Sequence, residues 1–470
     1  MKTFYRLVLT LSLACPAAFS AALGASPIPA TNTPEGKADA VTARMANVPL
    51  PTERAVNTGV VPRPAAVAPP IASQVEAPIG VVGTSLEEFE QLAKQNNPTL
   101  VQAAARVQAA QAECVQVGLY PNPNIGYKAT DIGVRGYSGK QGAFFSQEFV
   151  TGGKLKQNQA VALQTVEQCQ YAWQAQCQRV VNDVQRAFYD VLIAQTTMEL
   201  NDELVRIERE GVQAADALFA AKEVSRVDVL QARIEANTAN ILAEKSRNRH
   251  LAAWHGLAVV CGVPDMPPIR LSGALDGALS EFTWDVTIAR VLSESPEIAE
   301  ARSGVSRAEA VVTREYGARI PNITAEVGVF HDNEADDSIA EIQTGFPLPL
   351  FNRNQGNIRK AQADLVSARH EVRRKELETQ QRLAAVFEQY QNARCQVDHY
   401  SKEILPDARA SLELALAGYR QGELNYLLLL TAQRTYYHAH LAYVDALGDL
   451  RNTVVAMEGN LLADSLQQSR

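Results

Sequence analysis

Apolar residues recur along several long stretches of the chain with the period of a helix. In the clearest stretch they alternate steps of three and four residues: Leu383, Val386, Tyr390, Ala393, Val397, Tyr400 and Ile404. This is an a/d seam, which is typical of coiled coils and of the core stripe in any helix bundle. The pattern predicts helices over residues 85–117, 154–221, 224–260, 284–316, 354–421 and 424–460.

Two of the predicted helices, 154–221 and 354–421, are unusually long. About sixty residues that rise 1.5 Å each make a rod of about 90 Å. Pro406 lies inside the second of these helices and lacks the backbone N–H that an uninterrupted helix needs. We therefore expect a bend or a break near Pro406.

Between the helices, apolar and polar residues alternate with the period of a strand. The alternation predicts strands over residues 122–130, 143–149, 322–329 and 340–348, with polar loops over 131–140 and 331–338. Such strands fit two structures. One is an antiparallel sheet with a single face on a soluble core. The other is a transmembrane barrel that turns its apolar side chains toward lipid.

The N-terminal segment favours the membrane alternative. Lys2 and Arg6 precede a short apolar run and a set of small residues, as in a secretory signal peptide, here residues 1–25. Lipid attachment at Cys15 is an alternative, although the preceding residues match a lipobox poorly. Residues 26–83 are rich in Pro and Ala without a helical or strand period, which predicts a disordered leader.

The number of strands also carries a consequence. Four strands cannot close a membrane barrel, which usually needs about eight. Open sheet edges are not viable in lipid, because their N–H and C=O groups would have no partners. If the barrel interpretation holds, several chains must each contribute four strands.

The chain is a tandem duplication. Asn97-Pro98 corresponds to Ser295-Pro296, and Asn124-Ile125 to Asn322-Ile323, in each case 198 residues further along. Each half has the same order: helix, two strands, long helix, second helix. The predicted division is a first repeat (84–262), a linker (263–283), a second repeat (284–462) and a tail (463–470).

The junctions between strands and long helices carry special turn chemistry. In FPLPLFNRNQGN (346–357), Pro347 and Pro349 lack N–H groups, so a sheet ladder can end there without leaving a buried donor. Gly152 and Gly153 replace the prolines at the matching junction of the first repeat. We expect both junctions to act as hinges between a membrane strand and a periplasmic helix.

Composition and charge exclude several functions. The net charge is −8, which argues against a general nucleic-acid binder, because phosphate contacts need a basic surface. No Ser/His/Asp spacing, zinc motif or phosphate loop is present, so we expect neither an enzyme nor a cofactor. The cysteines after Cys15 are odd in number and show no metal-ligand spacing. We expect no metal site, and we interpret the acidic loop 331–338 as solvated.

The sequence resembles the TolC family of outer-membrane efflux factors over about residues 85–460. The resemblance rests on the duplicated layout, on the Pro-Asn strand starts and on GYRQGELNYLLLLTAQRTYY (418–437). The stretch PLPLFNRNQGNI (347–358) is most similar to the CzcC-like branch, whose members serve pumps for cobalt, zinc, cadmium or nickel ions.

This resemblance implies a mainly α fold with a transmembrane β part. It implies a homotrimer whose chains form a 12-stranded barrel in outer-membrane lipid and an α-helical tunnel across the periplasm. It also implies docking to a periplasmic membrane-fusion adaptor and an inner-membrane pump of the RND type. Cargo choice would rest mainly with the pump, because a conduit must release ions as easily as it admits them.

The resemblance also assigns roles to residues near the turns between long helices. Asp228 and Tyr419 match positions where the family uses a polar link to hold the periplasmic gate shut, although a solvated helix residue and a packing residue are the alternatives. The adaptor-contacting tips comprise Lys222, Glu223, Val224, Ser225, Gly422, Glu423, Leu424 and Asn425. Glycine is common in both tip turns of the family, whereas Lys222 stands in the first.

Three functions remain open from the sequence. The first is the exit duct of a tripartite metal exporter. The second is the same duct with organic drugs or a secreted protein as its cargo. The third is a soluble periplasmic coiled-coil scaffold without a pore, against which the four alternating strands argue.

Overall fold

The computed structural model describes residues 85–133, 139–277, 280–421 and 423–467. The predicted signal peptide (1–25) with Cys15, the predicted leader (26–83) and Gly422 lie outside the described residues.

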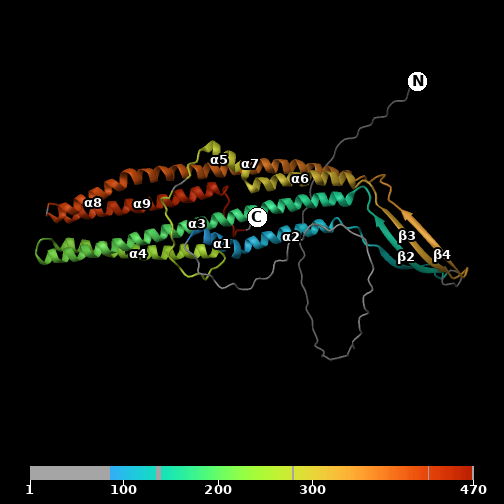
Figure 1. Cartoon of the computed structure of the whole chain (residues 1–470), viewed down its shortest axis with the longest axis horizontal. Coiled ribbons are helices and arrows are strands. Elements are labelled where there is room, and N and C mark those ends of the chain that lie inside the picture. Colours follow the sequence, from blue (N-terminus) through green and yellow to red (C-terminus); the bar gives the residue numbers. More distant parts are fainter. Residues whose placement is uncertain (1–84, 134–138, 278–279, 422, 468–470) are drawn as a thin grey trace, which may run out of the picture. The chain divides into compact units, whose positions relative to one another are not determined.

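The two repeats follow one another with the same order of elements (Figure 1). The first contains α1 (Leu86–Asn96), α2 (Pro98–Gln116), β1 (Asn124–Thr130), β2 (Lys140–Phe149), α3 (Lys154–Ala220) and α4 (Arg226–Val260). The second contains α5 (Trp284–Glu294), α6 (Pro296–Gly317), β3 (Ile323–Asp332), β4 (Asp337–Gly345), α7 (Gln355–His399), the π-helical turn η2 (Tyr400–Ile404), α8 (Leu405–Arg420) and α9 (Tyr426–Glu458).

The first helix of each repeat is divided in two, so the predicted single helices 85–117 and 284–316 were wrong at this point. A proline disfavours helical backbone in the residue before it. Asn97, which precedes Pro98, is accordingly extended (φ −71°, ψ 118°), and Ser295 before Pro296 adopts nearly the same angles (φ −63°, ψ 119°). Asn97 then caps α2 by accepting a hydrogen bond from the Thr99 N–H at 3.0 Å.

The break expected near Pro406 is confirmed. Helix α7 ends at His399, and the Leu405 N–H donates to the Tyr400 carbonyl, five residues earlier. The wider turn accommodates Pro406, which cannot donate and whose ring would clash in a regular helix. Beyond Ala393 the buried seam fades: Val397 and Tyr400 are half-buried, and Ile404 is exposed.

The strands form one antiparallel sheet in the order β1-β2-β3-β4. The predicted strands were right in number and place but wrong at several ends. β2 and β3 extend into the predicted polar loops, where Lys140 lies opposite Asp332 in the register. β4 begins and ends earlier than predicted, since its ladder to β3 stops at Thr324 opposite Gly345.

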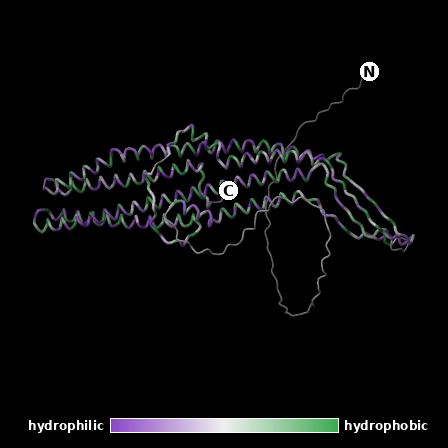
Figure 2. The backbone as a smooth tube through the Cα atoms, in the orientation of Figure 1, coloured by the Kyte–Doolittle hydropathy of each residue, from purple (hydrophilic) through white to green (hydrophobic). Residues whose placement is uncertain are grey.

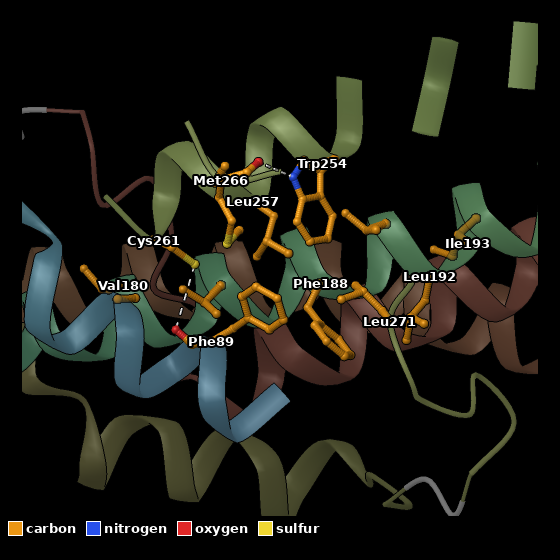
Figure 3. Packing of buried hydrophobic residues seen from close by; sticks show 14 of the residues in the cluster. Phe89, Val180, Phe188, Leu192, Ile193, Trp254, Leu257, Cys261, Met266 and Leu271 are labelled. Carbon is orange, nitrogen blue, oxygen red and sulfur yellow. Dashed lines mark hydrogen bonds between the residues drawn. The ribbon is translucent and has the colours of Figure 1, made fainter. Parts of the chain in front are cut away.

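Helix α3 carries most of the packing. It contacts α1, α2, α4, α6 and α9. The largest core cluster lies where α1, α3 and α4 meet, and Figure 3 shows the rings of Phe89 and Phe188 close to Trp254. The Phe89 and Trp254 rings meet edge to face at 6.2 Å, and the Trp254 Nε1–H donates to the Met266 carbonyl at 2.9 Å. The cluster therefore anchors the segment that joins the two repeats.

Hydrophilic and hydrophobic positions interleave along every helix (Figure 2). Among the described residues, no helix combines the length and the apolar character that crossing a membrane requires.

The end of α9 is held on α3 by a buried amide. The Asn182 side chain is 1% exposed and donates to the carbonyls of Gly459 and Leu462, at 2.9 and 2.7 Å. A Cβ at Gly459 would lie about 2.0 Å from the Asn182 amide, so only glycine fits there.

Replacing Asn182 is therefore expected to destabilise the whole helical layer. Asn182→Ala takes away the donor of the buried Leu462 carbonyl, while the Gly459 carbonyl keeps its bond from the Leu462 N–H. The loss of the two amide bonds costs about 1–3 kcal/mol. Thermal unfolding of the purified channel in detergent measures this as a lower midpoint. Gln362→Ala is the control, because this exposed side chain donates to the Tyr316 hydroxyl at the protein surface. Equal midpoints for the two variants would contradict the expectation.

Candidate functional site: the helical tips, the junctions and the sheet

The turn between α3 and α4 closes the first helical hairpin. The Glu223 N–H donates to the Leu218 carbonyl at 2.9 Å, and Lys222 adopts left-handed backbone (φ 61°). This is the Schellman ending, in which glycine is the usual left-handed residue. The predicted tip residue Lys222 thus lies at a strained position. The α8–α9 turn has the equivalent bond, from the Glu423 N–H to the Gly418 carbonyl at 2.9 Å.

Each tip is followed by a helix that begins at a capping residue. Ser225 and Asp228 form a reciprocal capping box at α4. The Asp228 Oδ2 accepts from the Ser225 N–H at 2.9 Å and from the Ser225 hydroxyl at 2.7 Å. These bonds hold the pKa of Asp228 below its usual value. At α9, the Asn425 Oδ1 accepts from the Leu428 N–H at 3.0 Å.

The two residues assigned to the gate act on one another electrostatically. Burial raises the pKa of the Tyr419 hydroxyl, and the charge of Asp228 raises it further. The Tyr419 ring also lies 6.1 Å from the Tyr426 ring. In the part of the chain that the structure describes, the Asp228 carboxylate bonds to Ser225 rather than to Tyr419. The gate role of this pair stays a prediction.

A buried polar cluster behind the tips was missed by sequence reasoning. The Arg434 guanidinium of α9 pairs with the Glu235 carboxylate of α4, which is 9% exposed. Glu208 of α3 is 5% exposed, and burial, together with the charge of Glu235, raises its pKa. Burial also raises the pKa of Tyr426, to about 12. This cluster joins the helical hairpin of the first repeat to that of the second.

The sequence did contain a signal for this cluster. The buried face of α4 comprises Val229, Ala232, Glu235, Ala239, Ala243 and Ser246, at steps of three and four residues. An acidic residue within such a stripe is rarely fully buried unless it is paired. The position of Glu235 in the stripe therefore predicts a basic partner, although the fold decides which residue that partner is.

The strand-to-helix junctions use left-handed residues. Gly152 and Gly153 have φ values of 66° and 67° before α3, and Asn354 has a φ of 58° before α7. The Asn354 Nδ2 donates to both the backbone carbonyl and the carboxylate of Glu315, at 2.9 and 2.7 Å. Asn354 thus takes the place of Gly153 and ties α7 to α6. The hinge roles of Pro347, Pro349 and the two glycines stay predictions.

Asn322 connects the middle of the sheet to α3. Its Oδ1 accepts from the Lys154 Nζ at 2.6 Å, and its Nδ2 donates to the Glu148 Oε1 at 2.7 Å. The Thr151 hydroxyl bonds to the Pro321 carbonyl as well. The Pro-Asn strand start noted in the sequence is therefore a hydrogen-bonded link between the repeats.

The sheet has one apolar and one polar face. The apolar face is exposed: Ile125 76%, Tyr127 67%, Phe145 47%, Val329 63% and Ile342 76%. On the polar face Lys128 lies 3.6 Å from Glu326, while the rings of Phe144 and Phe330 lie over Gly126 and Gly328. An exposed apolar face on alternating strands is typical of strands that face lipid.

Metal-ligating side chains do not gather in groups of three or more within the described ranges. The five described cysteines are free thiols.

A sheet with an exposed apolar face is continued by long paired helices. The family model of the outer membrane efflux proteins matches residues 90–263 and again residues 287–461. The chain belongs to this family. It is an efflux channel of the bacterial outer membrane that extends into the periplasm.

Among characterised relatives, the chain is similar to the cobalt-zinc-cadmium resistance protein CzcC of Cupriavidus metallidurans. The two are 28% identical over 364 residues, which span 77% of this chain and 86% of CzcC.

Solved structures of low identity share the fold. The crystal structure of CusC superposes with a TM-score of 0.69 at 17% identity, over 82% of this chain and 93% of CusC. The open-state MtrE channel of Neisseria gonorrhoeae gives a TM-score of 0.66 at 18% identity, over 81% of this chain and 89% of MtrE.

Relief of the strain at Lys222 should stabilise the first tip. Left-handed backbone costs a residue with a Cβ about 1 kcal/mol relative to glycine. Lys222→Gly is therefore expected to slow hydrogen exchange of the tip amides about five-fold. Lys222→Ala removes the charge but keeps the Cβ, so it should give no such protection. Equal protection in both variants would contradict a backbone origin.

The raised pKa of Glu208 predicts a pH-dependent effect on stability. The folded chain binds this proton more tightly than the unfolded chain, so stability is present below the unfolded-state pKa of Glu208 and is lost as pH rises through its raised folded-state pKa. Glu208→Gln should therefore raise the unfolding midpoint at pH 7.5 and give a smaller gain at pH 4.

The matched control is Glu210→Gln, which removes an exposed carboxylate that pairs with Arg206 on the same helix. Its effect should be small, because surface ion pairs contribute little. A gain for Glu208→Gln that is independent of pH would show that charge burial is not its cause.

Proposed function

We propose that this chain is the outer-membrane channel of a tripartite RND-type efflux system that exports divalent heavy-metal cations: cobalt, nickel, zinc or cadmium. The observation that carries the proposal is the similarity to CzcC, whose name records resistance to cobalt, zinc and cadmium, over most of both chains. Three copies would close a 12-stranded barrel and continue it as a helical tunnel.

The polar face of the sheet supports a cationic cargo. Carboxylates outnumber lysines among its side chains: Glu148, Glu326, Asp332, Asp337 and Glu341 against Lys128 and Lys140. In a closed barrel this face would line the lumen, since the apolar face is the one that suits lipid. A channel lined by excess negative charge raises the local concentration of cations.

The division of the chain into processing and folded segments belongs to the same proposal. Residues 1–25 would direct export and be removed, and the leader 26–83 would precede the first repeat. The repeats 84–262 and 284–462, joined by the linker 263–283, would each supply two strands and one helical hairpin, and residues 463–470 would form the tail.

The tips of the two helical hairpins are the proposed contact with the adaptor and the place of the gate. The α3–α4 and α8–α9 turns end the hairpins on the side away from the sheet (Figure 1). Asp228 and Tyr419 lie directly behind them, and the Glu235–Arg434 pair joins the two hairpins further along. Opening the tunnel at this end would require the hairpins to separate at these contacts.

The function is tested by tolerance to metal ions. Deleting the gene in its host should lower the inhibitory concentrations of one or more of cobalt, nickel, zinc and cadmium salts several-fold, while tolerance to detergents and dyes is unchanged. The intact gene on a plasmid should restore tolerance. Sensitivity to organic compounds alone would keep the channel but overturn the metal assignment in favour of an organic cargo.

A further inference from the structure

We propose that residues 346–350, Phe-Pro-Leu-Pro-Leu, are a one-sided continuation of β4 that pairs with β1 of a second copy of this chain. In the proposed register Leu348 lies opposite Tyr127 of the partner subunit. The inference rests on the proposed multi-chain barrel and specifies how one chain joins the next.

The direction of the hydrogen-bonding groups in the sheet is fixed by one bond. In antiparallel strands, successive residues turn their N–H and C=O groups alternately to the two neighbouring strands. The Asn333 N–H donates to the Gly139 carbonyl at 3.2 Å, in line with the ladder that places Lys140 opposite Asp332. Odd-numbered residues of β3 therefore turn their backbone N–H and C=O groups to β2, and even-numbered residues turn theirs to β4.

The same alternation passes into β4. Thr324 of β3 lies opposite Gly345, so odd-numbered residues of β4 turn their backbone groups to β3. Even-numbered residues turn theirs to the free edge. Within residues 346–350, the two prolines thus lack N–H groups only on the side of β3, where the ladder has already ended.

Continued through residues 346–350, the alternation would turn the N–H and C=O groups of Phe346, Leu348 and Leu350 to the free edge. In the single chain, the Leu350 N–H turns back to the Leu348 carbonyl at 2.9 Å. That short-range bond would be exchanged for two bonds to a partner strand. The prolines therefore prevent strand pairing on the side of β3 and leave the free edge able to pair with another strand.

The free edge of β1 is complementary. Its register with β2 turns even-numbered residues inward, which leaves Ile125, Tyr127 and Ala129 with outward backbone groups. The side chains of Ile125 and Tyr127 lie on the exposed apolar face, and the continued alternation of β4 would place the exposed Phe346, Leu348 and Leu350 on the same face. Pairing the two edges would extend the apolar face continuously from one chain to the next.

The duplication supplies the register. Gly153 and Asn354 are equivalent left-handed caps before α3 and α7, so Leu348 of the second repeat is the counterpart of Gln147 in the first. Gln147 lies opposite Ala325 of β3, and the Pro-Asn motifs make Ala325 the counterpart of Tyr127. The junction between chains then copies the junction between repeats, with Leu350 opposite Ile125 and Phe346 opposite Ala129 of the partner subunit.

Lipid provides the driving force. A backbone donor or acceptor left unpaired in hydrocarbon has no water to bond to, so a free strand edge there is unstable. Both free edges, at β1 and at residues 346–350, carry apolar side chains that belong at that depth. A second copy offers the complementary edge to each of them.

Cysteine cross-linking in the full-length chain tests the register. Residues directly opposite in neighbouring strands lie within disulfide reach, whereas residues four positions out of register do not. The variant Tyr127→Cys/Leu348→Cys should form covalent dimers and trimers under mild oxidation, at least about ten-fold more than Ile125→Cys/Phe346→Cys. Each single cysteine variant measures the contribution of the native thiols.

The outcomes separate this inference from the proposed function. If native mass measurement shows trimers but the out-of-register pair cross-links equally well or better, the register is wrong and the channel stands. If the chain is a monomer in detergent and in membranes, the proposed barrel fails and the inference fails with it. Metal tolerance of the host reports on the cargo independently.

Moving a proline by one residue is the second test. Pro347→Ala/Pro349→Ala should still assemble, because neither proline donates toward the partner. Adding Leu348→Pro to that background removes a donor on the free edge and should reduce the trimer about ten-fold. Equal assembly of the two variants would overturn the one-sided pairing.

Discussion

A very long helix cannot bury its apolar stripe by itself, and this constraint shapes most of the molecule. Helix α3 has 67 residues, and the helices that contact it are α1, α2, α4, α6 and α9, from both repeats. Two glycines of the second repeat leave room for side chains of α3, because a Cβ at Gly448 would overlap the Ile193 side chain and a Cβ at Gly459 the Asn182 side chain. The sheet and the tips are held at the two ends of α3 because the helices that cover it also lead into them.

The duplication preserves conformation more faithfully than residue type. Gly153 and Asn354 share the left-handed cap, and Ser225 and Asn425 share the N-cap of the helix after each tip. Asparagine tolerates left-handed backbone and caps helices with its side-chain oxygen, so it can replace either glycine or serine. The repeats differ where Asp228 completes a capping box and its counterpart Leu428 cannot.

Buried carboxylates are neutralised differently at two places along the helices. Near the tips, Glu208 and Glu235 are buried in the helix seam and Arg434 offsets them, so this contact between repeats is sensitive to protonation. At the start of α6, Glu297 lies between Arg179 of α3 and Arg382 of α7, and although burial opposes ionisation, the two arginines lower its pKa. A contact satisfied by two cations stays charged, which suits a fixed joint between α3, α6 and α7.

The sequence by itself determined the periodic features. Helical and strand periods depend on the spacing of apolar side chains, so the long helices, the four strands, the repeat and the break near Pro406 were all readable from local patterns. Family membership followed from residues 418–437 and 347–358 in the same way. The strand ends were not readable, because a ladder ends where its partner ends: Lys140 and Asp332 extend β2 and β3, while β4 stops at Gly345.

The tertiary structure alone decided which side chains meet across the chain. Glu235 meets Arg434, and Asn322 meets Lys154 and Glu148, over separations that no local period encodes. It also decided toward which neighbour each strand residue turns its backbone groups, since the register between strands fixes that direction. Periodicity specifies the face of an element, whereas contacts between elements depend on how distant segments align, and only the folded chain sets that alignment.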